Sequence, residues 1–232
     1  MKGYKLFYFV TCYYLASLIV VPKNTYGQKT TLRFDKWTSA ELSSAATYKG
    51  LEYLNPIDTA VLFYCNLVRI NPQLFKETYL ARFLENDKLE ELKKSPYTKS
   101  LLSYLSKREK GKPFFPDGDL TKIASIHAEF MGKKGKTGHD NYDKRFKDVE
   151  TKYTATGENC YYGSDNALEI VIQLLIDQNI SSLGHRKNIL STRFNYFGGS
   201  SKPHTKYGYN YVMCFGDKGV ITTKKRKRFL FF

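Results

Sequence analysis

Residues 157–190 read GENCYYGSDNALEIVIQLLIDQNISSLGHRKNIL and contain the most informative pattern of the chain. The segment GENCYYG predicts a short strand and a turn, because β-forming side chains lie between glycines. A helix then begins with Asp165 or Asn166 as its N-cap. Its apolar residues recur at helical spacing, at Ala167, Ile170, Val171, Leu174 and Leu175. The loop SSLG follows, and His185 to Leu190 predicts a short helical turn.

Three further helices are predicted before this stretch. Asp58 is the expected N-cap of the first, which ends near Asn71. Pro72 suits the first position of the second helix, because its fixed φ angle matches helical geometry. Asp119 is the expected cap of the third, which the glycines at 132, 135 and 138 interrupt. Its apolar face contains Leu120, Ile123, Ala124, His127 and Met131.

A β-hairpin is predicted over residues 195–215. Aromatic and apolar residues alternate there with the period of a strand, at Tyr207, Tyr209, Tyr211 and Met213. Predicted helices lie before and between the strands, but no βαβ unit repeats along the chain. The predicted fold class is therefore α+β, with helices layered over a small, mainly antiparallel sheet.

The composition excludes several protein classes. The chain has 232 residues, of which 42% are hydrophobic, 16% aromatic and 25% charged. These values exclude collagen, a coiled-coil rod, a polytopic membrane protein and a fully disordered chain. The length predicts one domain with extensions and permits a sizeable core.

Residues 1–27 have the composition of a signal peptide. Lys2 and Lys5 precede an almost wholly apolar run over residues 6–21, and a small-residue pattern precedes Gln28. We therefore predict cleavage near Gly27 and a secreted or periplasmic protein, with no transmembrane segment in the mature chain. The alternative is an uncleaved anchor, although the apolar run is shorter than the roughly 20 residues that span a bilayer.

The chain is strongly basic. Its formal net charge is +15, and five consecutive basic residues, Lys224–Arg228, lie near its end. Such a protein is drawn to acidic glycans or anionic lipid headgroups, whereas nucleic acid is not expected outside the cell. A solvated, solubilising surface is the alternative explanation of the charge.

Cys65, Cys160 and Cys214 remain after the predicted cleavage. An odd number permits at most one internal disulfide, and the lack of any CxxC pair excludes a cysteine zinc site. Cys65 is predicted to pack in the core. Cys160 and Cys214 lie on predicted strands that could be neighbours, so a bridge and two buried thiols both remain open.

The residues that could carry chemistry lie in three short motifs. His139 and His185 each follow a glycine in a loop, where the backbone can direct a side chain into a cleft. With Glu158 they supply two imidazoles and a carboxylate, which suit a divalent metal such as zinc. The same three residues could instead form a hydrogen-bonded network without metal.

Simpler structural roles are predicted for other polar residues. His127 lies on an apolar helix face and is predicted to be packed. His204 follows Pro203 in the hairpin loop and is predicted to be exposed. Glu158 could also be a buried acid that holds the sheet to a loop by hydrogen bonds.

The order of motifs resembles the CAP superfamily: a helix, GHD, GENCYYG, an amphipathic helix, SLGHRKNIL and a final strand. This family comprises cysteine-rich secretory proteins, antigen 5 and plant pathogenesis-related proteins, and its domain is also called SCP. The sequence HRKNIL is similar to the corresponding motif in the bacterial branch of the family. The resemblance covers roughly residues 58–216. It leaves residues 28–57 as an N-terminal extension that lies over the core or is poorly ordered, and 217–232 as a basic tail.

The resemblance implies a three-layer α-β-α sandwich with a shallow cleft lined by two histidines and two acids. His139, Glu158 and His185 match three of these residues. Asp177 is the candidate for the second acid, at a position where eukaryotic members usually have a glutamate after a tryptophan. The metal ligands implied by the match are His139, His185 and Glu158.

Three more polar residues match the family motifs. Asn159 and Asn188 match asparagines that we interpret as fixing loops by hydrogen bonds. Arg186 is expected to pair with a nearby carboxylate or to cap carbonyl groups. All three are therefore expected to support the cleft rather than to react.

The main functional hypothesis is a non-catalytic binding module, because no GxSxG motif surrounds Ser181 and Ser182 near His185. Its expected ligands are an acidic glycan, an anionic lipid or a lipophilic molecule, with metal as an optional occupant of the cleft. The alternative is a metal-assisted hydrolase in which Glu158 acts as base. A third hypothesis is a surface-adhesion protein with a vestigial cleft.

Overall fold

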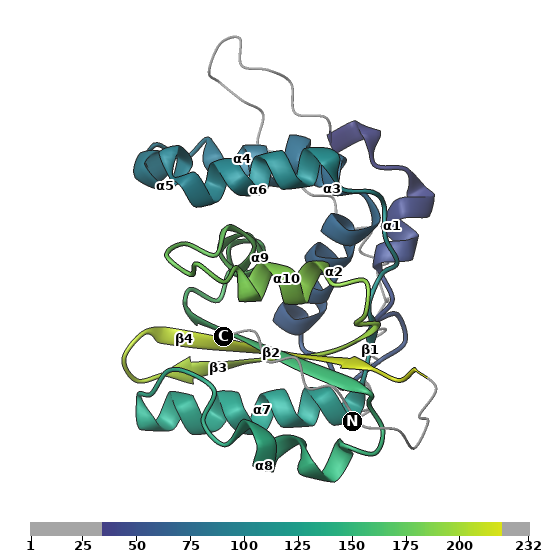
Figure 1. The fold of residues 1–232 in the computed structure, drawn as a ribbon, viewed down its shortest axis with the longest axis vertical. Helices are drawn as coiled ribbons and strands as arrows, with labels where there is room; N and C mark the ends of the chain where they lie inside the picture. The colour runs from purple at the N-terminus through teal and green to yellow at the C-terminus, as the bar shows by residue number, and fades with distance from the viewer. Residues whose placement is uncertain (1–33, 220–232) are drawn as a thin grey trace, which may run out of the picture. The chain divides into compact units, whose positions relative to one another are not determined.

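The computed structural model describes residues 34–219 (Figure 1). The predicted signal peptide and the basic stretch Lys224–Arg228 lie outside the described residues. The helices are α1 (Ser39–Ala45), α2 (Pro56–Ile70), α3 (Pro72–Phe75), α4 (Ala81–Leu84), α5 (Glu90–Lys94), α6 (Pro96–Lys107), α7 (Gly118–Lys134), α8 (Tyr142–Phe146), α9 (Ala167–Ile176) and α10 (Gly184–Leu190). The strands are β1 (Phe115–Pro116), β2 (Ala155–Gly163), β3 (Tyr196–His204) and β4 (Gly208–Asp217). Short 3-10 or π segments cover Phe34–Lys36, Lys76–Leu80, Asp87–Leu89 and Lys147–Val149.

The strands form one sheet in the order β1-β3-β4-β2. Strand β4 pairs antiparallel with both β2 and β3, whereas β1 adds a short parallel pairing to β3. The predicted C-terminal hairpin is therefore confirmed, and so is the strand at GENCYYG. Strand β2, which contains Glu158, lies at an edge of the sheet, where loops on both of its faces can approach it.

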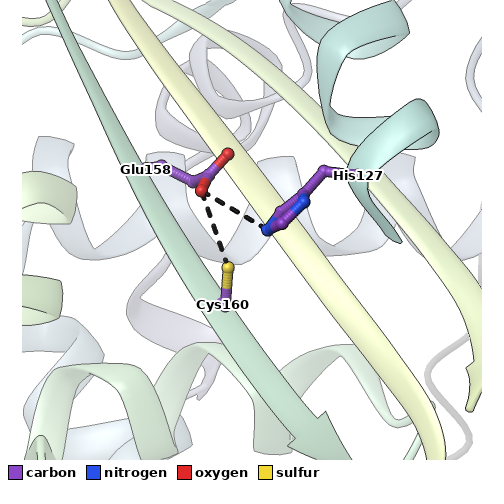
Figure 2. Close-up of side chains that lie close together, drawn as sticks. All are labelled: His127, Glu158 and Cys160. Atoms are coloured by element: carbon purple, nitrogen blue, oxygen red, sulfur yellow. Dashed lines mark hydrogen bonds and ion pairs between the residues drawn. The ribbon is translucent and has the colours of Figure 1, made fainter. Parts of the chain in front are cut away.

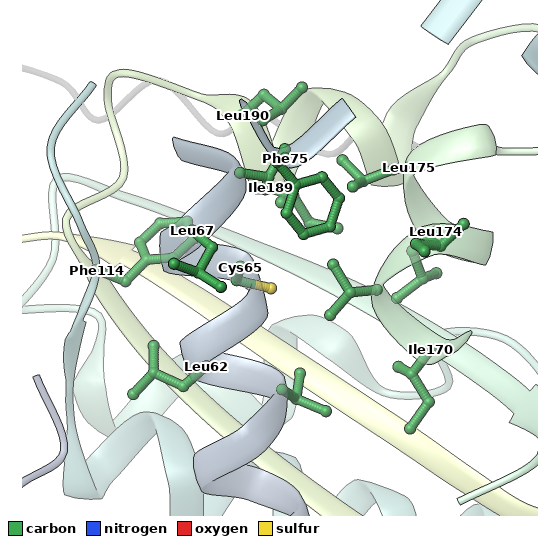
Figure 3. Close-up of a cluster of buried hydrophobic side chains, with 14 of the residues drawn as sticks. Leu62, Cys65, Leu67, Phe75, Phe114, Ile170, Leu174, Leu175, Ile189 and Leu190 are labelled. Atoms are coloured by element: carbon green, nitrogen blue, oxygen red, sulfur yellow. The ribbon is translucent and has the colours of Figure 1, made fainter. Parts of the chain in front are cut away.

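Helices cover both faces of the sheet, which confirms the three-layer α-β-α arrangement (Figure 1). Alternate residues of β4 show the two faces. Tyr211 and Met213 belong to the core cluster that includes α2, α9 and α10, and Val212 and Cys214 belong to the cluster with α7 and α8. Figure 3 shows part of the larger cluster, in which side chains from α2, α9 and α10 converge. Cys65 is buried in this cluster, as predicted.

Two helix caps differ from the predicted residues. Helix α2 begins at Pro56, with Asn55 as its N-cap, and Asn55 Oδ1 accepts a hydrogen bond from the backbone of Asp58 at 2.8 Å. Helix α7 begins at Gly118 and is capped by Asp117 rather than Asp119. Proline is favoured at the first position of a helix, so α2 begins at Pro56 and already contains Asp58, the predicted N-cap. Asn166 does cap α9, and Asn71 and Pro72 separate α2 from α3 as predicted.

Gly132 does not interrupt α7, which continues to Lys134 and ends at Gly135 with φ 61°. A Cβ atom at Gly132 would lie 2.1 Å from the carbonyl oxygen of Pro203 in β3. The backbone of Thr205 also donates a hydrogen bond to the Gly132 carbonyl, at 3.1 Å. Glycine therefore permits backbone contact between the helix and the hairpin.

Part of the predicted N-terminal extension packs in the core. Trp37, Ala45 and Leu54 are buried in the same cluster as α2. The indole Nε1 of Trp37 donates to Thr78 Oγ1 at 3.2 Å. Among residues 34–219, no helix combines the length and apolar character needed to cross a bilayer.

His204 is buried, so the prediction that it is exposed is wrong. Only 3% of the residue is accessible, and its Nε2 atom lies 2.8 Å from the carbonyl oxygen of Lys136. The turn at the tip of the hairpin is short, which keeps His204 within β3 and packs its ring against Tyr162 and Tyr207.

Cys65, Cys160 and Cys214 are buried free thiols. Of the two alternatives for Cys160 and Cys214, a disulfide or two buried thiols, the structure therefore shows the thiols.

Candidate functional site

Glu158 is the buried centre of one half of the site. Its side chain is 1% exposed, and Oε1 accepts hydrogen bonds from His139 Nδ1 and Arg145 Nη2, both at 2.8 Å. The second oxygen, Oε2, accepts from Arg145 Nη1. Burial alone would raise the pKa of this carboxyl group, but the hydrogen bonds from His139 and Arg145 lower it to about 2. Glu158 is therefore a carboxylate held between two donors.

The loop that carries His139 is fixed through the peptide groups of Gly138. The backbone N–H of Gly138 donates to the hydroxyl oxygen of Tyr162 at 2.8 Å. Its carbonyl oxygen accepts from His127 Nε2 at 3.0 Å. Gly138 has φ 106°, a conformation that a side chain would strain. Tyr162 and His127 thus hold the backbone immediately before His139.

His127 is 1% exposed, in agreement with the prediction that it is a packed histidine. Burial lowers the pKa of its ring, against the opposing effect of nearby Glu158. The ring is therefore a neutral donor to a carbonyl group.

Asp177 and His185 form the other half of the site. His185 Nδ1 lies 2.7 Å from Asp177 Oδ1, and the carboxylate is completely buried. Asp177 Oδ2 accepts hydrogen bonds from the backbone N–H groups of His185 and Arg186, at 3.0 and 3.2 Å. Asp177 has a left-handed backbone conformation, φ 59°, at the end of α9. This conformation turns the chain so that one carboxylate fixes both the ring and the first turn of α10.

Two asparagines connect the halves through β2. Asn159 Nδ2 donates to the carbonyl oxygen of His185 at 3.0 Å. Asn188 Nδ2 donates to Asn159 Oδ1 at 2.8 Å and to the Glu158 carbonyl oxygen at 3.3 Å. Because side chains alternate along a strand, Glu158 faces α7 and α8 while Asn159 faces α10. The loop-fixing contacts expected of both asparagines are present.

Arg186 has the second of its two predicted roles. Its guanidinium group donates to the carbonyl oxygens of Leu175, Ile176 and Tyr97, at 2.6, 2.9 and 3.0 Å. Arg186 is a residue of α10, so its side chain connects this helix to the end of α9 and to α6.

Both histidines have the same chemical arrangement. In each, Nδ1 contacts a buried carboxylate, while the side chain as a whole is partly accessible, 18% for His139 and 20% for His185. A carboxylate accepts but does not donate, so Nδ1 carries the proton and Nε2 carries the lone pair in the neutral ring. This tautomer can accept a proton, accept a hydrogen bond or ligate a metal.

The family model described as the cysteine-rich secretory protein family, CAP, matches residues 106–215, which include every residue of both histidine–carboxylate pairs. Residues 106–215 therefore form a CAP domain. No curated protein sequence matches the chain significantly.

Three solved structures are similar to parts of this chain. An outer surface protein from Borrelia burgdorferi is 17% identical, with TM-score 0.40, over 56% of this chain and 95% of that protein. An extracellular SCP-domain protein from Bacillus anthracis is 20% identical, with TM-score 0.39, over 52% of this chain and 40% of that one. A cysteine-rich secretory protein from Staphylococcus aureus is 18% identical, with TM-score 0.35, over 52% and 36%. The match therefore spans less than half the length of the latter two proteins.

In the part of the chain that the structure describes, one group of potential metal-ligand atoms lies within 4.8 Å of one another. It consists of His127, Glu158 and Cys160 (Figure 2). The chemistry of this group does not fit a metal ion. His127 Nε2, the nitrogen nearest Glu158, already donates to Gly138, and the guanidinium of Arg145 occupies both oxygens of Glu158. Burial raises the pKa of the Cys160 thiol well above its ordinary value, which keeps it protonated.

The predicted ligand set of His139, His185 and Glu158 fits only in part. The tautomers of both histidines suit metal ligation through Nε2, because metal-binding imidazoles commonly donate their other N–H to a carboxylate. Glu158 instead makes the supporting contacts of such a carboxylate. Its hydrogen bonds favour an orienting role over direct ligation.

The sequence did not indicate Arg145 or the positioning role of His127. Arg145 lies in the basic segment YDKRFKD, where nothing distinguishes it from solvated lysines and arginines. Its contact with Glu158 depends on how α8 folds back against β2. Tyr162, adjacent to the GEN motif, is similarly indistinguishable from the other tyrosines of the strand.

Proposed function

We propose that this CAP protein is an exported, non-catalytic binding module, and that His139 and His185 present their Nε2 atoms to a ligand. The observation that carries the proposal is the pair of buried carboxylates, Glu158 and Asp177, each bonded to Nδ1 of one histidine. Two rings oriented in this way, one on the loop after α7 and one in the first turn of α10, are preorganised hydrogen-bond acceptors.

The protonation states of the Glu158 carboxylate and of the cysteine thiols favour a binding function over a catalytic one. Glu158 has a pKa of about 2 and an arginine partner, which makes it a weak base at neutral pH. Burial raises the pKa of Cys65 to about 12, and those of Cys160 and Cys214 lie well above the ordinary value. These thiols are therefore poor nucleophiles.

A divalent metal such as zinc would be held by Nε2 of His139 and of His185. A bound ion would supply a Lewis acid that coordinates an oxygen atom of the ligand. Glu158 and Asp177 would hold the two rings and keep their Nδ1 atoms protonated.

Metal analysis of the purified protein tests this role. We expect stoichiometric zinc in the wild-type protein and its loss in His139→Ala and in His185→Ala. Asp177→Asn should weaken zinc binding by about 10- to 100-fold, because it removes the orienting charge. Asp165→Asn, the same chemical change at an exposed loop residue, is the matched control and should retain the metal. Unchanged zinc in both histidine variants contradicts the metal role.

A hydrolase is the second candidate function, because a histidine fixed by a carboxylate can act as a general base when its Nε2 atom holds no metal. His185 with Asp177 is the better base candidate, since its carboxylate is not paired with an arginine side chain in the part of the chain that the structure describes. Peptide hydrolysis that disappears in Asp177→Asn but persists in Asp165→Asn would favour this function.

Export to the extracellular or periplasmic space forms part of the proposal. The signal-like composition of residues 1–27 and the match of residues 106–215 to a secretory protein family support it. The net charge of +15 supports acidic glycans or anionic lipids as ligands, alongside a lipophilic molecule. Sequencing the N-terminus of the exported protein should give Gln28 as its first residue.

A further inference from the structure

A surface pocket of about 590 Å³ lies apart from the histidine site. It is bounded by the C-terminal half of α6, the loop after it and Thr192, which follows α10. Pockets that bind small molecules have volumes of about 300–1,000 Å³. None of its lining residues belongs to either histidine–carboxylate pair.

The charges around this pocket are unbalanced. Lys107, Arg108 and Lys110 line it, with Glu109 as the acidic residue among the lining side chains. Lys110 pairs with Glu41 at 3.1 Å. Within residues 34–219, neither Lys107 nor Arg108 makes an ion pair with a carboxylate. Two cations are therefore available to an anion.

Arg108 is positioned by neutral groups. Its Nη1 atom donates to the Tyr104 hydroxyl at 2.6 Å, and Nη2 donates to the carbonyl oxygen of Leu190. Its Nε atom is buried and makes no hydrogen bond in the described part of the chain. This N–H is closed to solvent and to a ligand, so Arg108 contributes its uncompensated positive charge to the pocket that it lines.

A second arginine adds positive potential behind the pocket. Arg69 is 3% exposed, and four carbonyl oxygens accept its hydrogen bonds, those of Lys112, Ile189, Ser191 and Phe194. Burial, together with repulsion from Arg108, lowers the pKa of Arg69 to about 10. The carbonyl groups accept hydrogen bonds from its N–H groups but, being neutral, do not cancel its positive charge.

The remaining lining residues suit a polyhydroxylated ligand. Ser100, Ser103 and Thr192 supply hydroxyl groups, and Tyr104, which is 43% exposed, supplies an aromatic ring. We propose that this pocket binds an anionic carbohydrate, whose phosphate, sulfate or carboxylate group contacts Lys107 and Arg108. The ligand class rests on the proposed binding function, whereas the location of the pocket does not.

Isothermal titration calorimetry of the full chain with glucose 6-phosphate, glucose 6-sulfate and glucuronate tests the inference. At least one should bind with one-to-one stoichiometry, more tightly than glucose or inorganic phosphate alone. Lys107→Glu should weaken this binding at least about tenfold, because a charged hydrogen bond is replaced by repulsion. Thr192→Val, which leaves the charge unchanged, should weaken it about three- to tenfold.

Lys122→Glu is the matched control, since Lys122 is an exposed helical lysine on α7 and the change in net charge is identical. It should leave affinity within about twofold. Equal weakening by Lys107→Glu and Lys122→Glu, or inorganic phosphate binding as tightly as the sugar anions, would overturn the proposal. No binding of any of the three sugars would do so too. His139→Ala should leave the titration unchanged, so that this proposal and the histidine-site function can fail separately.

Discussion

The Nε2 atom of His127 donates a hydrogen bond to the carbonyl oxygen of Gly138, which directly precedes His139. The two groups lie 3.0 Å apart, and the His127 side chain is almost completely buried. A histidine from α7 therefore fixes the loop that presents a second histidine to solvent. The contact makes His127 a positioning residue.

Replacing His127 with leucine should lower the free energy of unfolding by about 1–3 kcal/mol, because the Gly138 carbonyl loses its buried donor. It should also change the NMR chemical shifts of the His139 ring, whereas those of the His185 ring should remain unchanged. His127→Gln, which can still donate, should restore part of both properties. An unchanged His139 signal in a folded His127→Leu protein contradicts the positioning role.

Glu158 should make stability fall in acid. Its pKa is lowered from 4.5 to about 2 in the folded protein, so its contribution is complete above pH 4.5 and is lost as the pH falls toward 2. The loss is of the order of 3 kcal/mol. Chemical denaturation from pH 2 to 6 should show this slope in the wild-type protein and a flatter one in Glu158→Gln. The slope is the diagnostic quantity, because Glu158→Gln also weakens the protein at neutral pH by leaving Arg145 unpaired.

Asp58 should have the opposite effect. It is 3% exposed on α2, and burial raises its pKa from 3.8 to about 7, against smaller effects of its hydrogen bonds. Its stabilising contribution is therefore complete below pH 3.8 and is lost as the pH rises through 7, by up to about 4 kcal/mol. Asp58→Asn should flatten the profile between pH 4 and 7. An unaltered profile in this variant would show that Asp58 titrates normally.

The basic stretch near the end of the chain should contribute to binding of acidic glycans. Truncation after Thr223 removes Lys224–Arg228 and should lower the salt concentration that elutes the protein from a heparin column. Truncation after Arg228 removes the last four residues and keeps the basic stretch, so it should elute like the full chain. Equal elution of all three proteins would assign the affinity to the body of the protein.

Much of the fold follows from local patterns. The alternation in β4 and the helical spacing in α9 could be recognised because residue types follow the period of each element. Strand β4 is nevertheless buried on both faces, because one face packs in each of the two core clusters. The caps of α2 and α7 were misassigned because several polar residues compete near each helix start, and Asn55 and Asp117 precede Pro56 and Gly118. Helix boundaries depend on such neighbours more than on the apolar stripe.

The site was predictable where a motif kept its residues together. His139, Glu158 and His185 were identified from GHD, GEN and GHRKNIL, and the contact of His139 with Glu158 is present. Arg145 could not be found, because its contact with Glu158 joins two elements whose packing no local pattern encodes. His204 was misjudged for the same reason: its partner, the Lys136 carbonyl, is 68 positions away.

The backbone contact at Gly132 limits how this protein can adapt to what it binds. Helix α7 and the β3–β4 hairpin meet there with no side chain between them, and the Thr205 hydrogen bond closes the same junction. A sliding movement of one against the other would bring main-chain atoms into collision. Helix α7 and the hairpin therefore act as one rigid unit beside His139, and the hydrogen bonds at Gly138 tie the intervening loop to that unit.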